Sequence, residues 1–419
     1  MTAANAELKR RNRAHFDWLL VIAVYLLAIF GIYMIASATY DPDMGADSTL
    51  LNRVLNSRSS MWQSIFVLAS PIVLLVVSSV PIDLFRSQTR LIYLAVVSLL
   101  VITLVTTTLV NGIRAWLNTG LGRSIQPAEF AKISVMMSLA RNLSKSEKPV
   151  ANVREFFQIA VIVGIPTMIV LAQGETGSVI VIVVMFVLML YFSGADIRLV
   201  LGIVAAGALG IAAIIGYALI TDSSDYRILR LLAFTDPTKY QSSGGYQLLN
   251  SQKAIGSGQL TGMKAFTLGT VTQLGGVPEN STDFILSSIG EAYGFIGVSA
   301  VLAVYLFIIL RMLYLARYTR DQYGKLLIVG VMSMLFFHVF ENISMCLGLM
   351  PITGIPLPFL SYGGSNFMTN IIGVALVINV TRSRTGSSGM YNAGGYAESE
   401  GVKRFLREKP KKAKHAARN

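Results

Sequence analysis

The chain has 419 residues, of which 53% are hydrophobic and only 14% are charged. Soluble domains carry about 25% charged residues, so this composition excludes an ordinary soluble protein and indicates a polytopic membrane protein. The formal net charge is +13. Such an excess orients a membrane protein in the bilayer and contacts anionic lipid, so we expect no nucleic-acid partner.

Cysteine and histidine are too sparse for disulfide or metal chemistry. The one cysteine, Cys346, lies in an apolar run and has no partner for an internal disulfide. The three histidines, His15, His338 and His415, show no metal-ligand spacing, so we expect no bound structural metal. The first apolar run begins at about Phe16 and is long enough to span a membrane, which indicates a retained helix.

Ten apolar segments predict an all-α membrane protein with ten transmembrane helices in one domain over residues 17–381. The fourth segment is the weakest, because Glu129 and Lys132 lie within it. An even number of spans places both chain ends on one side of the membrane. The segments are 17–38, 61–81, 91–110, 125–140, 156–172, 177–193, 199–220, 286–310, 326–348 and 364–380.

Lysine and arginine are concentrated on one predicted side of the membrane. They are frequent in the N-terminal residues 1–16, in the loops near 141–154 and 311–325, and in the tail 382–419, which we predict to be disordered. By the positive-inside rule both termini are cytoplasmic. The loop 221–285, between the seventh and eighth spans, is then outside the cell.

The long exterior loop does not have the composition of a linker. Its part "DYRILRLLAFTDPTKY" has helical spacing of apolar residues and predicts an amphipathic helix along the membrane interface. Tyr246–Ala254 predicts a second short helix, ended by Gly256 and Gly258. Exterior loops of this length are more often functional than not.

The stretch "RAWLNTGLGRSIQPAEFAKI" carries charges into the fourth span. Pro127 is typical of a helix start, and Glu129 and Lys132, three residues apart, lie on one face and can pair. The pair is either a packing ion pair or the charged lining of an outward-open cavity. In the second case Arg114 and Arg123 would be nearby phosphate binders.

Two further stretches lie on the same exterior side. "QGETGS" is a tight turn in which Glu175 is either a solvated turn residue or part of a site. "PITGIPLPFLSYGGS", residues 351–365, has three prolines and three glycines and cannot form a spanning helix. We expect a re-entrant or tightly folded loop that lines a protein cavity.

"VPENSTDFILSSIGEAYGFIG", residues 277–297, places Asp283 just before an apolar run. Asn280 could cap that helix, with Asp283 at its third position, and this alone would explain the acid. The alternative is that Asp283 performs chemistry at the membrane surface, with Glu279 before it and Glu291 eight residues later. A lipid-linked, phosphate-bearing substrate fits such a site, as does a transported soluble metabolite.

The motifs resemble the SEDS family of bacterial cell-wall proteins, which includes RodA, FtsW and SpoVE. The resemblance runs from about Asp17 to Asn379, and "TGIPLPFLSYGGS" and "LGTVTQ" are most similar to RodA. Six motifs carry it, in chain order: "RAWLNTG" with "QPAEFAK", "DP" at 236–237, "GYQLLNSQKAIGSG", "VPENSTDFILSSIGEAYGFIG" and "ITGIPLPFLSYGGS".

The resemblance implies a peptidoglycan glycosyltransferase that polymerises lipid II on the outer face of the bacterial cytoplasmic membrane, during elongation and shape maintenance. It also implies a class B penicillin-binding protein, a transpeptidase, as partner. The alternatives are a flippase or transporter of the lipid-linked precursor, a polymerase of division or sporulation, and a scaffold without activity.

The resemblance further implies that Asp283, in the "TDF" motif, is the catalytic residue, as a base or as the organiser of a cation. Arg114, Lys132 and Arg227 would neutralise phosphate charge. No cofactor is implied, and a divalent cation, Mg²⁺ or Mn²⁺, at the diphosphate is left open. The other substrate-binding candidates are Glu129, Glu175, Lys253, Glu279, Glu291, Ser361 and Ser365.

The sequence departs from the family pattern at several positions. Ser281 stands where the family usually has histidine, Ala292 replaces a second acid, and His338 replaces a glutamine. Glu175 stands in place of an aspartate. These differences predict a divergent member, such as a paralogue with a specialised partner, and leave the fine substrate preference open.

Overall fold

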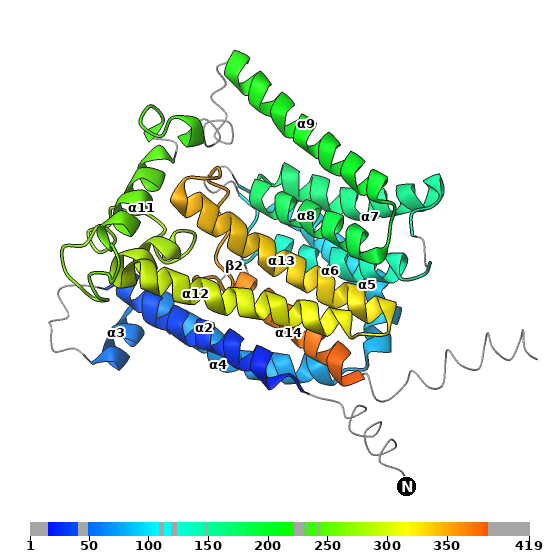
Figure 1. Cartoon of the computed structure of the whole chain (residues 1–419), viewed down its shortest axis with the longest axis horizontal. Coiled ribbons are helices and arrows are strands. Elements are labelled where there is room, and N and C mark those ends of the chain that lie inside the picture. Colours follow the sequence, from blue (N-terminus) through cyan, green and yellow to red (C-terminus); the bar gives the residue numbers. More distant parts are fainter. Residues whose placement is uncertain are drawn as a thin grey trace, which may run out of the picture.

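The computed structural model describes residues 16–40, 49–108, 113–118, 124–146, 149–221, 230, 233–241 and 244–383. Within these residues the chain is a bundle of long helices with one short strand pair (Figure 1). Arg123, Arg227, most of the predicted interfacial helix and the basic tail lie outside the described residues. The elements are α2 (Trp18–Ala38), α3 (Leu50–Asn56), α4 (Arg58–Ser79), α5 (Ile82–Thr106), β1 (Leu117–Asn118), β2 (Ser124–Ile125), α6 (Pro127–Leu143), α7 (Val153–Ala172), α8 (Thr176–Ser193), α9 (Ile197–Thr221), α11 (Gly245–Ser257), α12 (Ile285–Arg317), α13 (Gln322–Leu347) and α14 (Gly364–Ser383).

All ten predicted segments fall on helices. Eight helices in the described part of the chain are long and apolar enough to cross a membrane: α2, α4, α5, α7, α8, α12, α13 and α14. The other two segments correspond to α6 and α9. α6 has 17 residues, including Glu129 and Lys132, and in α9 only Ile197–Gly210 counts as a short apolar helix. The structure therefore confirms a multi-pass membrane protein.

Helix ends extend beyond the apolar segments from which the spans were predicted. α5 begins at Ile82, nine residues before the predicted start at 91. The prediction began late because Asp83, Arg86 and Arg90 interrupt the apolar pattern in the first turns of the helix. Charged residues are compatible with a helix that continues past the hydrocarbon core into the interface. α3 and the pairing of β1 with β2 were not predicted, because these elements are too short to produce a periodic pattern.

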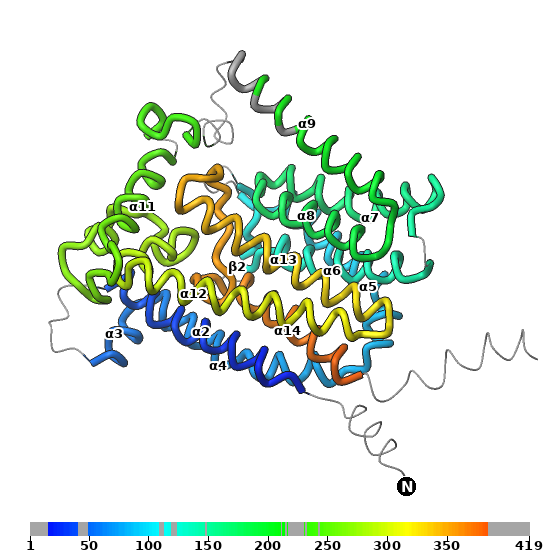
Figure 2. The backbone as a smooth tube through the Cα atoms, in the orientation of Figure 1, coloured from blue at the N-terminus to red at the C-terminus, as the bar shows by residue number. Residues whose placement is uncertain are grey.

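α13 and α14 form the centre of the bundle. Of the most apolar stretch of α13, 83% is buried, compared with 17% for α5. Figure 2 shows α13 passing through the middle of the molecule, and it packs against α6, α8, α12 and α14. The outer helices expose large apolar side chains such as Leu68 and Leu209, which a lipid bilayer would cover.

α11 confirms the short helix predicted over Tyr246–Ala254, and the turn after it packs on the first part of α12. α12 is interrupted at Gly294, which has a φ of +60° that favours glycine. The break frees the amides of Phe295 and Ile296, which donate to the carbonyls of Gln259 and Leu260 at 2.8 and 3.1 Å. The loop after α11 thus completes the hydrogen bonding of the broken helix.

Residues 351–365 form no helical span, as predicted, and run as a buried to half-buried, turned segment from the end of α13 into the first residues of α14. α2 approaches this segment closely at Gly31, where a Cβ would lie 2.6 Å from the carbonyl oxygen of Leu360. Both neighbours of the segment are therefore fixed, α13 by burial and α2 by a contact that only glycine permits.

Substitution of Gly258 tests the α11–α12 contact. A Cβ at Gly258 would lie 1.9 Å from the carbonyl oxygen of Gly290, so we expect Gly258→Ala to destabilise the protein by about 1–3 kcal/mol. Gly256→Ala is the matched control, because nothing lies within 4 Å of its Cβ position. Thermal unfolding in detergent should show a lower Tm for the first variant only, and equal Tm values would contradict the contact.

Candidate functional site

Asp283 does not cap a helix, so the capping interpretation is wrong. α12 begins at Ile285, after Asp283, and its N-cap residue Phe284 makes no side-chain capping hydrogen bond. The Asn280 side chain instead donates to the carbonyls of Ala38 and Thr272, each at 3.0 Å. These tertiary contacts prevent Asn280 from acting as the cap that the local sequence suggests.

The backbone before α12 is held by the segment 351–365. The Ser361 hydroxyl donates to the carbonyl of Thr282 at 2.6 Å, and the Tyr362 amide donates to the carbonyl of Ser281 at 2.8 Å. Ser361 thus positions the loop through its backbone rather than presenting a free hydroxyl. These hydrogen bonds bring the two motifs, both predicted on the exterior side, into direct contact.

α13 holds Asp283 from the other side. The Asn342 side chain donates to the backbone carbonyl of Asp283 and to that of Ile355, both at 2.7 Å. One buried amide therefore ties the loop of Asp283 to the segment 351–365. Both bonds use the Asp283 main chain, so they fix the residue without occupying its carboxyl group.

The carboxyl group of Asp283 lies beside Gly354 and Arg230. A Cβ at Gly354 would be 3.2 Å from Oδ2 of Asp283 and 3.8 Å from Nη1 of Arg230. The pKa of Asp283 is raised to about 7, mainly by burial and to a smaller extent by the Glu279 carboxylate, while the Arg230 guanidinium opposes this rise. A carboxyl with this pKa can release and accept a proton near neutral pH, as a general base must.

Glu341 is a second acid at this site that the sequence analysis missed. It lies in α13, close enough to Asp283 for the two charges to interact. The Thr353 hydroxyl donates to Oε1 of Glu341, while Oε2 has no hydrogen-bond partner among the described residues. An acid inside the apolar segment 326–348 was the available signal, because such residues are functional candidates by default.

Glu129 and Lys132 form a closed ion pair inside the bundle. Lys132 Nζ lies 2.7 Å from Oε1 of Glu129 and 3.1 Å from Nε2 of His338. The Asn366 side chain donates to the other Glu129 oxygen at 3.0 Å. The two residues are only 3% and 1% exposed. This geometry favours the packing ion pair over the lining of an open cavity.

Glu175 is buried, so the alternative of a solvated turn residue is wrong. Gln126 and Ser178 donate to its two oxygens at 2.9 and 3.0 Å. Burial raises the pKa of Glu175 to about 7, with the Glu129 carboxylate adding to this rise and the hydrogen bonds opposing it. The backbone N–H of Gln126 donates to the Ser365 hydroxyl at 3.1 Å, so Gln126 links Glu175 to the segment 351–365.

The other predicted site residues lie apart from this arrangement or at its edge. Both oxygens of Glu291 accept hydrogen bonds from Val271 and Thr272, so its carboxylate holds the loop after α11. Lys253 is exposed on α11, and Arg114 is exposed beside the turn that contains Glu175. Glu279 is also exposed, and the Thr282 hydroxyl donates to it at 2.9 Å.

The sequence model of the cell cycle protein family FtsW, RodA and SpoVE matches residues 17–386. The chain belongs to this family. Peptidoglycan glycosyltransferase MrdB of Escherichia coli (strain K12) is 29% identical over 373 residues, which cover 89% of this chain and 95% of that protein. Stage V sporulation protein E of Bacillus subtilis (strain 168) is 33% identical over 372 residues, covering 87% and 97%.

Solved structures of the family have the same fold. The rod shape determining protein RodA of Thermus thermophilus superposes with a TM-score of 0.64 at 25% identity, covering 88% of this chain and 98% of that one. A chain from "Structural coordination of polymerization and crosslinking by a peptidoglycan synthase complex" superposes with a TM-score of 0.71 at 25% identity, with coverages of 88% and 98%. The match therefore extends over nearly the whole of both family members.

Removal of one partner tests the buried ion pair. Lys132→Met leaves the Glu129 carboxylate buried without its cation, so we expect a loss of stability of about 3–5 kcal/mol. The neutral pair Glu129→Gln with Lys132→Met should recover most of it, because the glutamine carbonyl still accepts from Asn366. Lys253→Met, at an exposed lysine, is the control and should leave Tm unchanged. A double variant less stable than the single one would contradict the ion-pair account.

Proposed function

We propose that this chain is a peptidoglycan glycosyltransferase that polymerises lipid II into glycan strands at the outer face of the cytoplasmic membrane, during elongation and shape maintenance. The observation that carries the proposal is Asp283: its carboxyl, with a pKa raised to about 7, is held beside Arg230 by the segment 351–365. Relatives named peptidoglycan glycosyltransferase align over nearly their whole length, which supports the same activity here.

The proposed topology has ten spans, with α6 and α9 added to the eight apolar helices. Both termini lie in the cytoplasm, and the loop 221–285 with Asp283 lies outside. The distribution of basic side chains supports this orientation, because those at the end of the bundle opposite Asp283 are numerous. They include Arg86, Arg90, Arg141, Lys145, Arg317, Arg320 and Lys325.

The arrangement around Asp283 supplies the two functions that glycosyl transfer needs. Ionised Asp283 accepts the proton of the acceptor hydroxyl as that oxygen forms the new bond to the anomeric carbon of the donor sugar. The bond from this carbon to the diphosphate breaks, and the diphosphate leaves with the electron pair. Arg230, which also lies beside Gly354, provides positive charge for the leaving group.

A divalent cation would find few protein ligands at this site. Among the described residues, no group of three His, Cys, Asp or Glu side chains could hold a metal ion. A Mg²⁺ or Mn²⁺ ion bound to the diphosphate would therefore take most of its ligands from the substrate and water. The proton acceptor and the positive charge proposed here, Asp283 and Arg230, are both protein groups.

We also propose a class B penicillin-binding protein as partner, which would crosslink the strands that this chain makes. The similarity to a chain from a peptidoglycan synthase complex supports this assignment. A flippase or transporter is the second candidate, because Glu129 and Lys132 place charge inside a helix of the bundle. Their enclosure by His338 and Asn366 makes that candidate the weaker one.

Replacement of the proposed base tests the activity directly. Asp283→Asn removes the proton acceptor, so polymerisation of labelled lipid II should fall by about 10²–10⁴-fold, at equal folded yield and with the partner present. Asp196→Asn is the control, because Asp196 is exposed in the turn between α8 and α9 and should leave the rate unchanged. Equal product from wild type and Asp283→Asn would remove Asp283 from catalysis.

The pH dependence of the rate gives an independent test. If ionised Asp283 is the base, the rate should rise with pH and level off above about 7, the value to which burial raises the Asp283 pKa. Glu279→Gln removes a carboxylate that raises this pKa, so the midpoint should move to lower pH. Arg230→Gln removes a cation that lowers the pKa, so the midpoint should move to higher pH. Shifts in the same direction for both variants would contradict the assignment.

A further inference from the structure

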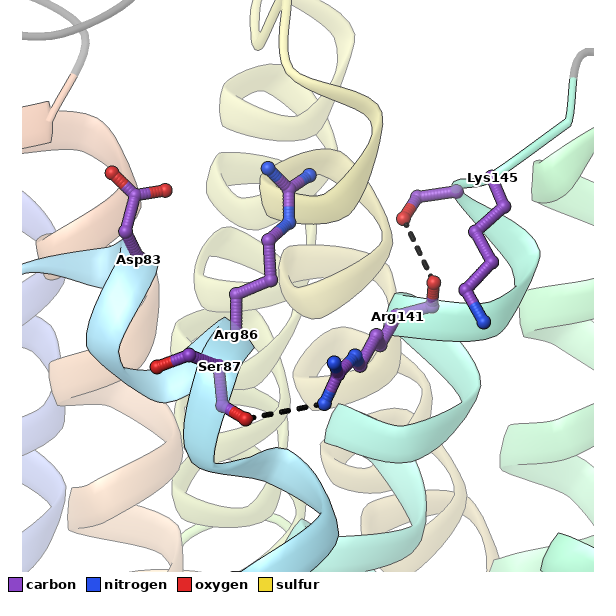
Figure 3. A pocket seen from close by; sticks show the side chains of 6 residues that line it. Asp83, Arg86, Ser87, Arg141 and Lys145 are labelled. Atoms are coloured by element: carbon purple, nitrogen blue, oxygen red, sulfur yellow. Dashed lines mark hydrogen bonds between the residues drawn. The ribbon is translucent and has the colours of Figure 1, made fainter.

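A polar cavity lies far from Asp283, between the beginning of α5 and the end of α6. Its volume is about 460 Å³, which is within the usual range for small-ligand sites. Figure 3 shows Asp83 and Arg86 on α5, with Arg141 and Lys145 at the end of α6. The lining residues are Asp83, Arg86, Ser87, Arg141, Ser144 and Lys145.

The cavity and Asp283 lie at opposite ends of the bundle. Arg86 forms an ion pair at 3.0 Å with Asp321, which lies between α12 and α13, whereas Asp283 lies just before α12. The part of α12 that follows Gly294 is by itself long enough to cross a hydrocarbon core of roughly 30 Å at about 1.5 Å per residue. The two sites therefore face opposite leaflets.

Two cations at the cavity form no ion pair with any acid that the structure describes. Arg141 donates to the backbone carbonyl of Ser87 at 3.2 Å, and Lys145 donates to the side-chain oxygen of Asn142 at 2.8 Å. Neither belongs to an ion pair within the described part of the chain, whereas the charge of Arg86 is compensated by Asp321. An anion placed between Arg141 and Lys145 would give each side chain a negatively charged partner.

The charges around Lys145 are mostly positive. Burial and the nearby guanidinium groups of Arg141 and Arg90 lower the pKa of Lys145. The acid among the lining residues is Asp83, and Figure 3 places it on the far side of Arg86 from Arg141 and Lys145. A bound anion would relieve the repulsion between these cations.

We propose that this cavity binds a phosphate ester, held by Arg141 and Lys145, and that the headgroup of an anionic phospholipid is its source. The cavity lies where α5 begins and α6 ends, at the level where phospholipid headgroups meet a spanning helix. Basic pockets between the ends of transmembrane helices are suited to such headgroups. The site is independent of Asp283 and of the reaction proposed there.

Native mass spectrometry of the full chain, released from mixed micelles, tests the proposal. Wild type should retain phosphatidylglycerol in preference to phosphatidylcholine. Each cation near a headgroup contributes about a fivefold change, so Arg141→Gln or Lys145→Gln should weaken retention about fivefold and the double variant about 30-fold. Arg198→Gln is the matched control, because it removes the same charge from an exposed position at the same end of the bundle.

A second arm identifies the source of the phosphate. Protein in phosphatidylcholine micelles is titrated with inorganic phosphate, and the rise in Tm is measured. A rise that the double variant lacks, without selective phosphatidylglycerol retention, would assign the site to a soluble phosphate ester. Lys145 is exposed, so its single variant should fold even if the double variant does not. Wild type, Lys145→Gln and Arg198→Gln that retain phosphatidylglycerol equally and respond equally to phosphate would overturn the proposal.

Discussion

The structure around Asp283 depends on hydrogen bonds to the backbone N–H and C=O groups of a segment that cannot form a helix. Residues 351–365 contain three prolines and are buried or partly buried in a helical bundle, where fewer waters can bond their polar groups than at an open surface. Their partners come from the loop before α12 and from α13, through Ser361, Tyr362 and Asn342. The same hydrogen bonds fix the loop of Asp283, so the backbone requirement of one segment positions the carboxyl of another.

The buried acids differ in how completely their oxygens are occupied. Glu291 and Glu175 accept hydrogen bonds at both oxygens. One oxygen of Glu129 pairs with a lysine, and the other accepts a hydrogen bond from an asparagine. Asp283 is instead held through its main-chain carbonyl, and a glycine leaves space beside its carboxyl group. A carboxyl fixed in position and still able to exchange a proton is suited to catalysis, whereas the fully bonded acids are suited to holding the fold.

The sequence predicted the features that depend on local pattern and missed those that depend on tertiary contact. Long apolar runs, Pro127 at the start of α6 and the prolines of residues 351–365 determine their own local structure, and each prediction is confirmed. Asn280 fits a capping pattern, but contacts with Ala38 and Thr272 prevail. Glu291 has the spacing of a site residue, yet its partners come from a loop whose path no periodicity reveals.

The positions of the charges also separate a polymerase from a transporter in physical terms. A transport path needs charged groups at the middle of the bilayer that can exchange partners with the cargo and with water. The mid-bundle charges of α6 are closed instead: Glu129 and Lys132 bind each other, and His338 and Asn366 complete the group. Asp283, beside Arg230, lies at one end of the bundle, and Arg141 and Lys145, which form no ion pair among the described residues, lie at the other. Chemistry at the membrane surface, without passage through the bundle, is the activity that this distribution favours.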